Sequence, residues 1–192
     1  MADLQSTMKV LFVSSQITQN FKPFSYMLSD TRFEMSLVSC SGAEPKLWQG
    51  QEYINKNVFA HEIPKGLPFK ILKNISPMPS LSSFWGLINP ELFSLAFRSH
   101  CSVVYGHAYA SFWIVIAVTK LTGKKLILTN DAIALNSNSK IKKYCKRLFY
   151  KFLYHYLSDL VLVPSTRAAE FLKSLGIKDH KIIRGKYFLY WQ

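Results

Sequence analysis

Acidic side chains, cysteines and glycines are all scarce in this sequence of 192 residues. It contains 11 Asp plus Glu against 24 Lys plus Arg, together with three Cys, eight Gly and eight Pro. So few Gly and Pro exclude collagen-like and low-complexity chains, and so few Cys exclude a disulfide-stapled scaffold. Cys40, Cys101 and Cys145 share no CxxC spacing and lie among mostly apolar residues. We therefore expect buried thiols in a reducing cytoplasm.

Large apolar side chains are abundant instead. Hydrophobic residues make up 49% of the chain and aromatic residues 15%, whereas only 18% are charged. This composition is opposite to that of a disordered chain, and the length suits one sizeable core rather than two full domains. We expect a single domain over residues 1–192, with its core at about residues 8–184.

Two segments have features of an export signal or a membrane span. The start is polar, and the apolar run after Lys9 covers only Val10–Val13, which is too short for a signal peptide. Residues 99–119 carry no Asp, Glu, Lys or Arg and approach the roughly 20 residues that a spanning helix needs. Because His100 and the Tyr105–His107 segment interrupt this stretch, we interpret it as a buried strand, a turn and a buried helix.

The chain alternates short β-branched or apolar runs with helical patterns. The predicted strands are Lys9–Ser15, Phe33–Ser39, Val58–Ile63, Cys101–Tyr105, Lys125–Thr129, Asp159–Pro164 and Lys181–Ile183. The predicted helices are Phe21–Ser29, Ser82–Ser99, Ala110–Leu121, Lys140–Leu157 and Arg167–Leu175, with loops over 64–79 and 130–139. This alternation predicts an α/β fold, a Rossmann-like parallel sheet with helices on both faces.

Ligands of such a sheet bind at the carboxyl ends of its strands. The candidate residues there are Ser14, Ser15, Gln16, Gly106, His107, Asn130, Asp131 and Ser165. His107 suits a general base, with Asp131 as its partner or as a ligand of a substrate hydroxyl. A purely structural role stays open for both residues, because a single His after a strand is often structural and Asp is common in turns. Ser165 suits either a helix cap or a phosphate-binding helix start.

Familiar nucleotide, hydrolase and metal motifs are absent from the sequence. It contains no GxGxxG after the first predicted strand, and no GxxxxGK[ST], GxSxG or HExxH. Its histidines show no metal-ligand spacing with Cys or Asp. We therefore predict neither a metal site nor a bound cofactor.

The net charge of +13 is concentrated in one segment, since residues 132–158 contain no acidic side chain. At about 100° per residue, the cations fill one half of a helix and an apolar stripe fills the other. The cations are Lys140, Lys142, Lys143, Lys146, Arg147 and Lys151, and the stripe is Ile141, Cys145, Leu148, Phe152 and Tyr156. An ordinary solvated helix and a helix on anionic lipid head groups both fit. The absence of a recognition motif disfavours nucleic acid.

Several segments occur in an order that points to a known family. They are Met8–Ser14, Ser102–His107, Thr122–Asp131, the basic helix, Ser158–Ser165, a short helix to Leu175–Ile177 and Lys181–Ile183. Over roughly Met8 to Arg184, and most specifically over Asp159–Lys181, this order resembles the N-terminal half of GT-B glycosyltransferases of the retaining, family 4-like kind.

The resemblance implies one half of a GT-B architecture, in which this domain binds the acceptor and a second Rossmann-like domain binds the nucleotide-sugar. It places His107 and the Ser14–Gln16 loop on the acceptor side of the cleft, and Asn130 and Asp131 in a reactive-centre turn. Two positions depart from the family pattern. The first loop, Ser14–Thr18, lacks the usual glycines, and Asn130 stands where a His is common.

The function implied is transfer of a sugar, of the hexosyltransferase type, to a glycan or lipid-linked acceptor in polysaccharide biosynthesis. The expected partners are that acceptor, an anionic membrane surface on the cytoplasmic side, and a separate donor-domain polypeptide, because the sequence ends at Gln192 before a donor domain. The alternative is a non-catalytic basic module that binds membrane lipid or nucleic acid on a transferase-like fold.

Overall fold

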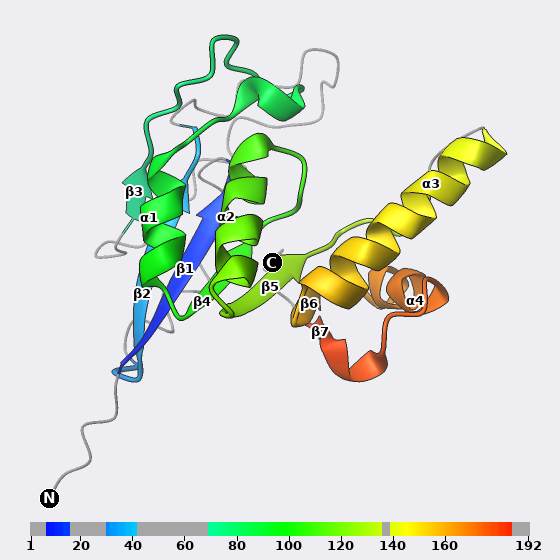
Figure 1. Ribbon diagram of the computed structural model, residues 1–192. Coiled ribbons are helices and arrows are strands. Elements are labelled where there is room, and N and C mark those ends of the chain that lie inside the picture. The colour runs from blue at the N-terminus through cyan, green and yellow to red at the C-terminus, as the bar shows by residue number, and fades with distance from the viewer. Residues whose placement is uncertain (1–6, 16–29, 42–68, 136–138, 186–192) are drawn as a thin grey trace, which may run out of the picture.

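The computed structural model describes residues 7–15, 30–41, 69–135 and 139–185, which include one all-parallel sheet (Figure 1). The strand order is β3-β2-β1-β4-β5-β6-β7. The strands are β1 (Met8–Ser14), β2 (Phe33–Ser39), β3 (Phe69–Ile71), β4 (Cys101–Val104), β5 (Lys125–Thr129), β6 (Leu160–Val163) and β7 (Ile182–Arg184). The predicted Rossmann-like α/β fold is therefore confirmed.

The centre of the sheet is formed by the most apolar strands. All four residues of β4 are buried, as are the last five residues of β1. In the parallel register Val10 lies opposite Cys101 and Val13 lies opposite Val104. Continuous apolar runs are typical of parallel strands that are covered on both faces, which is why these strands could be found from the sequence.

The described α-helices are α1 (Glu91–Arg98), α2 (Ala110–Leu121), α3 (Lys140–Lys151) and α4 (Thr166–Ser174). Of these, α1, α2 and α4 pack on one face of the sheet, whereas α3 has no buried residue. The main core cluster consists of residues from α1, α2 and α4, two residues that follow α3, and alternate strand residues such as Leu11 and Leu128. The second cluster consists of strand residues alone, including Phe12 and Val103. The helix predicted at 21–29 and the strand predicted at 58–63 lie outside the described residues, so the helices expected on the second face stay a prediction.

The apolar stretch 99–119 is divided between β4 and α2, as predicted, with a turn between them. Within the described ranges, no helix combines the length and the apolar character that crossing a membrane requires.

Three predicted boundaries are wrong for local reasons. The helix predicted over 82–99 is split into a 3-10 turn, η2 (Phe84–Gly86), and α1, because Pro90 starts a new helix at its N-cap. The loop predicted over 64–79 contains the short strand β3. The basic helix changes at Lys151 into the π-helix η3 (Phe152–Leu157), where the backbone N–H of Ser158 donates to Leu153 O at 3.1 Å.

The prediction of buried thiols holds for two of the three cysteines. Cys40 and Cys101 are buried, and burial raises the pKa of their thiols to about 12 and about 11. Cys145 is exposed on α3, so for this residue the prediction was wrong. Its helix projects away from the sheet (Figure 1), and the cations Lys143, Lys146 and Arg147 lie close to it in the sequence.

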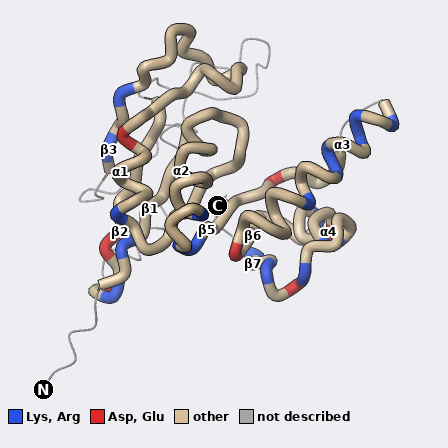
Figure 2. The backbone as a smooth tube through the Cα atoms, in the orientation of Figure 1, with Lys and Arg blue, Asp and Glu red and all other residues tan. Residues whose placement is uncertain are grey.

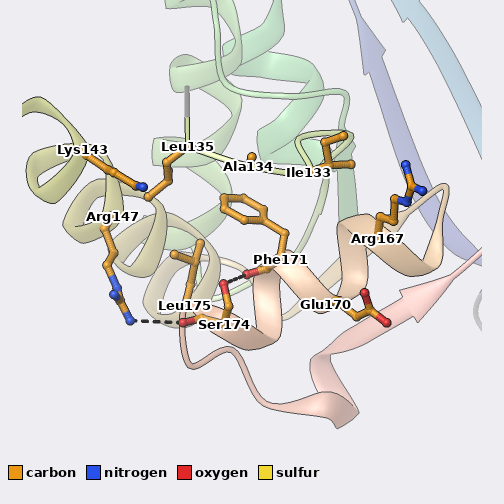
Figure 3. A pocket seen from close by; sticks show the side chains of 10 residues that line it. All are labelled: Ile133, Ala134, Leu135, Lys143, Arg147, Arg167, Glu170, Phe171, Ser174 and Leu175. Atoms are coloured by element: carbon orange, nitrogen blue, oxygen red, sulfur yellow. Dashed lines mark hydrogen bonds between the residues drawn. The ribbon is translucent and has the colours of Figure 1, made fainter. Parts of the chain in front are cut away.

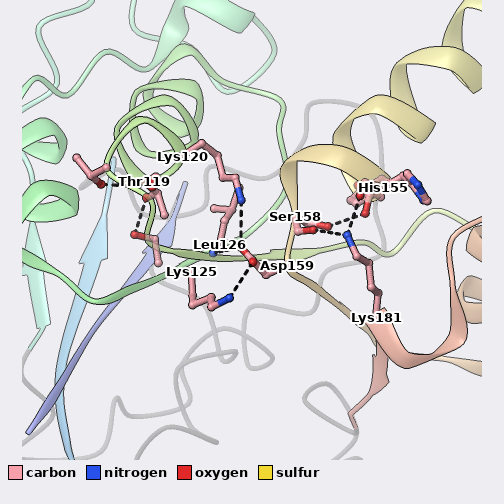
Figure 4. Close-up of polar contacts among 11 residues, drawn as sticks. Thr119, Lys120, Lys125, Leu126, His155, Ser158, Asp159 and Lys181 are labelled. Carbon is pink, nitrogen blue, oxygen red and sulfur yellow. Dashed lines mark hydrogen bonds and ion pairs between the residues drawn. The ribbon is translucent and has the colours of Figure 1, made fainter.

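Asp159, which directly precedes β6, forms hydrogen bonds with residues of β5 and α2 (Figure 4). Its carboxylate accepts hydrogen bonds from the backbone N–H of Leu126 at 2.9 Å, Lys120 Nζ at 3.2 Å and Lys125 Nζ at 3.3 Å. Burial alone would raise the pKa of this carboxyl, but the Leu126 N–H and the two ammonium groups together hold it below its usual value. η3 ends two residues before Asp159. There Lys181 Nζ donates a hydrogen bond to His155 O at 2.7 Å.

We expect Asp159→Asn to lower the free energy of unfolding by about 1–2 kcal/mol near neutral pH, because it removes the charge from three hydrogen bonds. Urea denaturation measures this change. Since the folded pKa is lowered, the stabilisation is complete above the unfolded pKa of about 4 and is lost as pH falls through the folded pKa. The difference between the two proteins should therefore shrink in acid.

The matched control is Asp179→Asn, which removes an exposed carboxylate that pairs with Lys173 at 2.7 Å. Its effect should be clearly smaller, because water screens that pair. Equal effects of the two substitutions would contradict the role assigned to Asp159.

Candidate functional site

His107 lies in the turn between β4 and α2, at the carboxyl edge of the sheet. Gly106 precedes it with a φ of 96°, a conformation that glycine adopts without strain. The backbone N–H of Gly106 donates to Val104 O at 3.0 Å, and Trp113 Nε1 donates to His107 O at 3.0 Å. These two contacts fix the turn, so the position of the imidazole is set by β4 and α2.

Aromatic rings from the end of α3 and from η3 enclose the His107 ring. The centroids of Phe149 and Tyr150 each lie 5.4 Å from it, and that of Tyr154 lies 6.3 Å away. Burial lowers the pKa of His107, while the charge of Asp131 acts in the opposite direction. The imidazole is therefore neutral at neutral pH and able to accept a proton.

Tyr154 joins His107 to the end of β5. Its buried hydroxyl donates to Asn130 Oδ1 at 3.2 Å and lies 3.5 Å from His107 Nδ1. Asn130 is itself buried, with its backbone N–H donating to Leu162 O at 2.9 Å and its Nδ2 to Ala132 O at 3.2 Å. The structure thus brings together two predicted site residues through a third that sequence reasoning missed.

Asp131 follows Asn130 and is exposed. Burial raises the pKa of Tyr150, and the charge of Asp131 adds to that effect, just as it opposes the lowered pKa of His107. Its carboxylate therefore acts electrostatically on the aromatic cluster around His107 and is accessible to a ligand. Within the described residues, no three His, Cys, Asp or Glu side chains are grouped as a metal site.

Ser14 and Ser15 lie at the carboxyl end of β1, the parallel neighbour of β4, and so at the same edge of the sheet as the turn that carries His107. Ser14 is buried at the end of β1, where its carbonyl accepts from the backbone N–H of Cys40 at 2.9 Å. Ser15 is half-buried and forms a hydrogen bond with Tyr109, which opposes the rise that burial causes in the pKa of that phenol. Gln16 lies outside the described residues.

Ser165 acts as the N-cap of α4. Its exposed side chain accepts a hydrogen bond from the backbone N–H of Ala168 at 3.2 Å. Of the two interpretations of Ser165, the structure supports the helix cap.

The basic helix α3 projects away from the sheet, and none of its residues is buried (Figures 1 and 2). Its six cations Lys140, Lys142, Lys143, Lys146, Arg147 and Lys151 are all exposed. The predicted apolar stripe is exposed as well, with Ile141 at 77%. Contact with the domain is made by Phe149, Tyr150, Leu153 and Tyr154 instead, so both the cations and the stripe are accessible.

A cavity of about 470 Å³ lies between the segment after β5, α3 and α4 (Figure 3). Its lining combines apolar side chains with three cations and one carboxylate. The charged residues are Lys143, Arg147, Arg167 and Glu170, and the apolar ones include Ile133, Leu135, Phe171 and Leu175. Arg147 Nη2 also donates to Ser174 O at 3.2 Å. The Tyr150 ring lies beside both Phe171, which lines the cavity, and His107, with centroid distances of 6.1 and 5.4 Å.

Two solved structures resemble the fold of this chain at low sequence identity. A protein described as a UDP-N-acetylglucosamine 2-epimerase from Listeria monocytogenes has 11% identity and a TM-score of 0.48, and covers 92% of this chain. The UDP-N-acetylglucosamine 2-epimerase from Rickettsia bellii has 10% identity and a TM-score of 0.46, and covers 93%. This chain spans 44% of each of those chains.

A comparison with curated protein sequences finds no match. The family model named Glycosyltransferase Family 4 matches residues 40–184, which is most of the chain. It includes β4 to β7 together with His107, Asn130, Asp131 and α3. The match confirms the family that the order of segments indicated, and the chain belongs to glycosyltransferase family 4.

Proposed function

We propose that this chain is the acceptor-side domain of an enzyme that transfers a sugar from a nucleotide-sugar to a glycan or lipid-linked acceptor. The observation that carries the proposal is His107 at the carboxyl edge of a family 4 domain, half-buried among the rings of Phe149, Tyr150 and Tyr154. This edge is where ligands of doubly wound sheets bind. The nucleotide-sugar would bind to a second Rossmann-like domain, either in the same polypeptide or as a separate one.

The chemistry requires a proton acceptor. Transfer forms a bond between an acceptor oxygen and the anomeric carbon of the donor sugar, and it breaks the bond from that carbon to the nucleotide diphosphate. The acceptor hydroxyl must lose its proton, and a neutral imidazole can take it. In this proposal His107 accepts the proton and the nearby Asp131 carboxylate stabilises the imidazolium that forms, while Tyr154 holds the ring in position.

We propose that α3 holds the domain on the cytoplasmic face of an anionic membrane, where a lipid-linked acceptor lies. Cations attract anionic head groups, and the exposed stripe from Ile141 to Tyr156 can enter the interfacial region. The cation-lined cavity beside α3 offers a place for an anionic group of the acceptor. Lys143 and Arg147 belong both to the membrane-facing set and to this cavity.

His107→Gln should lower kcat by about 100-fold or more, as expected for the loss of a general base, while thermal stability changes little. The assay measures sugar transfer in the presence of the donor-binding domain. In the unchanged enzyme, kcat/KM should fall only as pH drops below the lowered pKa of His107.

The matched control for this substitution is His100→Gln. His100 precedes β4 at the opposite edge of the sheet, where its Nδ1 accepts from the backbone N–H of Lys9 at 2.9 Å. Its replacement should leave kcat unchanged. Full activity of the His107 variant would remove His107 from the site.

Replacing all six α3 cations by Gln should weaken binding to anionic vesicles by more than about 100-fold, because each cation near the surface contributes roughly 1 kcal/mol. Sedimentation with vesicles measures this binding, which should also weaken as salt is raised. The control neutralises six cations elsewhere, namely Lys9, Lys73, Arg98, Lys125, Lys178 and Arg184. Vesicle binding that the α3 substitutions leave unchanged would rule out the membrane role.

A further inference from the structure

The segment from Asn74 to Asn89, here called the 74–89 loop, exposes large apolar side chains without a single charge. It connects β3 to α1 and contains no Asp, Glu, Lys or Arg. Its exposed side chains are Ile75, Met78, Phe84 and Trp85, with Met78 at 76% and Trp85 at 64%. Exposed apolar side chains grouped in this way mark interaction surfaces.

Hydrogen bonds within the 74–89 loop hold its backbone in one conformation. Asn74 Nδ2 donates to Gly86 O at 2.9 Å, and Asn74 Oδ1 accepts from the backbone N–H groups of Ile88 at 2.9 Å and Ser76 at 3.1 Å. Ser76 Oγ donates to Trp85 O at 2.7 Å. The two sides of the loop are thereby joined through Asn74 and Ser76.

Close backbone packing holds the aromatic pair at the turn. A Cβ added to Gly86 would lie 1.9 Å from Ser80 O, so only glycine lets the two sides approach this closely. Phe84 and Trp85 directly precede this contact, and their rings meet edge to face with centroids 5.0 Å apart. Both rings are exposed although the backbone beneath them is tightly packed.

The base of the loop is anchored in the core by Asn89, which is fully buried. Its Nδ2 donates to Cys40 O at 3.0 Å and to Lys73 O at 2.9 Å, and its Oδ1 accepts from Ser111 Oγ at 2.8 Å. These contacts connect the loop to the end of β2 and to the start of α2. The base of the loop is therefore attached to the sheet and to α2.

The 74–89 loop and α3 extend beyond the sheet at two places. In Figure 1 the loop stands beyond the N-terminal end of α2, on the β3 side, while α3 extends obliquely from the β6 and β7 side with its N-terminal end pointing upward, as the loop does. Figure 2 shows charged residues along α3 and none in the loop. One element thus offers apolar rings and the other offers cations.

We infer that the 74–89 loop inserts Met78, Phe84 and Trp85 into the interfacial layer of an anionic membrane while α3 binds its head groups. Trp and Phe favour this layer, and a charge-free loop enters it without desolvating an ion. The cations of α3 complement the lipid charge, whereas the loop offers a protein partner no charged group to pair with. The inference rests on the membrane part of the proposed function.

The test compares the full chain with Phe84→Ser/Trp85→Ser in sedimentation with vesicles of equimolar phosphatidylglycerol and phosphatidylcholine. Affinity should fall about tenfold or more, since two interfacial aromatic side chains are lost. The matched control is Phe93→Ser/Phe97→Ser, which removes a stacked pair from α1 with similar exposure, 59% and 55%. This control should stay within about twofold of the parent.

Trp85→Phe gives a second readout that preserves an aromatic side chain. Lipids brominated on their acyl chains should quench the tryptophan emission of the bound parent, and the quenched fraction should fall in Trp85→Phe. An unchanged quenched fraction would overturn the inference even if the serine variant misfolded.

The outcomes separate this inference from the proposal on which it rests. If the α3 substitutions abolish vesicle binding while the serine pair keeps the affinity of the parent, the loop inference is wrong and the membrane role of α3 stands. The loop would then be a surface for protein contact. If the parent does not bind the vesicles at all, both membrane statements are wrong, whereas the sugar-transfer assay is unaffected.

Discussion

The candidate site depends on the hydrogen bonding of the buried Tyr154 hydroxyl. It bonds to Asn130 at the end of β5 and lies beside His107 in the turn after β4, so it joins three segments at one edge of the sheet. A buried hydroxyl without partners is costly, which makes this arrangement specific. Because Tyr154 belongs to η3, the same contact sets where α3 leaves the domain.

The carboxyl edge therefore combines two properties. The aromatic cluster keeps His107 neutral beside the exposed Asp131, which suits proton transfer from an acceptor hydroxyl. Phe149 and Tyr150 of this cluster belong to α3, which presents cations and an exposed apolar stripe. The 74–89 loop, whose Leu81 O accepts from the Tyr109 hydroxyl at 2.7 Å, presents Phe84 and Trp85. In the proposed function, a lipid-linked acceptor would reach the base without its apolar chain leaving the membrane.

Much of the fold could be predicted from the sequence, because parallel strands covered on both faces leave continuous apolar runs such as Val10–Val13. His107 and Asn130 could be placed at one edge by the same topology. Tyr154 could not be chosen, since two sets of apolar residues recur at helical spacing along α3 and η3, and periodicity does not tell which set meets the domain. The structure packs Phe149, Tyr150, Leu153 and Tyr154 on the core and leaves the predicted stripe exposed. The exposure of Cys145 was missed for a related reason, as periodicity identifies an apolar stripe but not whether anything covers it.

The most direct test of this account is an NMR titration of the His107 imidazole in the folded chain, assigned by comparison with His107→Gln. The account predicts that the imidazole titrates below the ordinary histidine pKa of about 6.5, because the rings of Phe149, Tyr150 and Tyr154 shield it from water. A pKa at or above that value would contradict the account, since His107 would then be charged or exposed and would lack the environment assigned to a base.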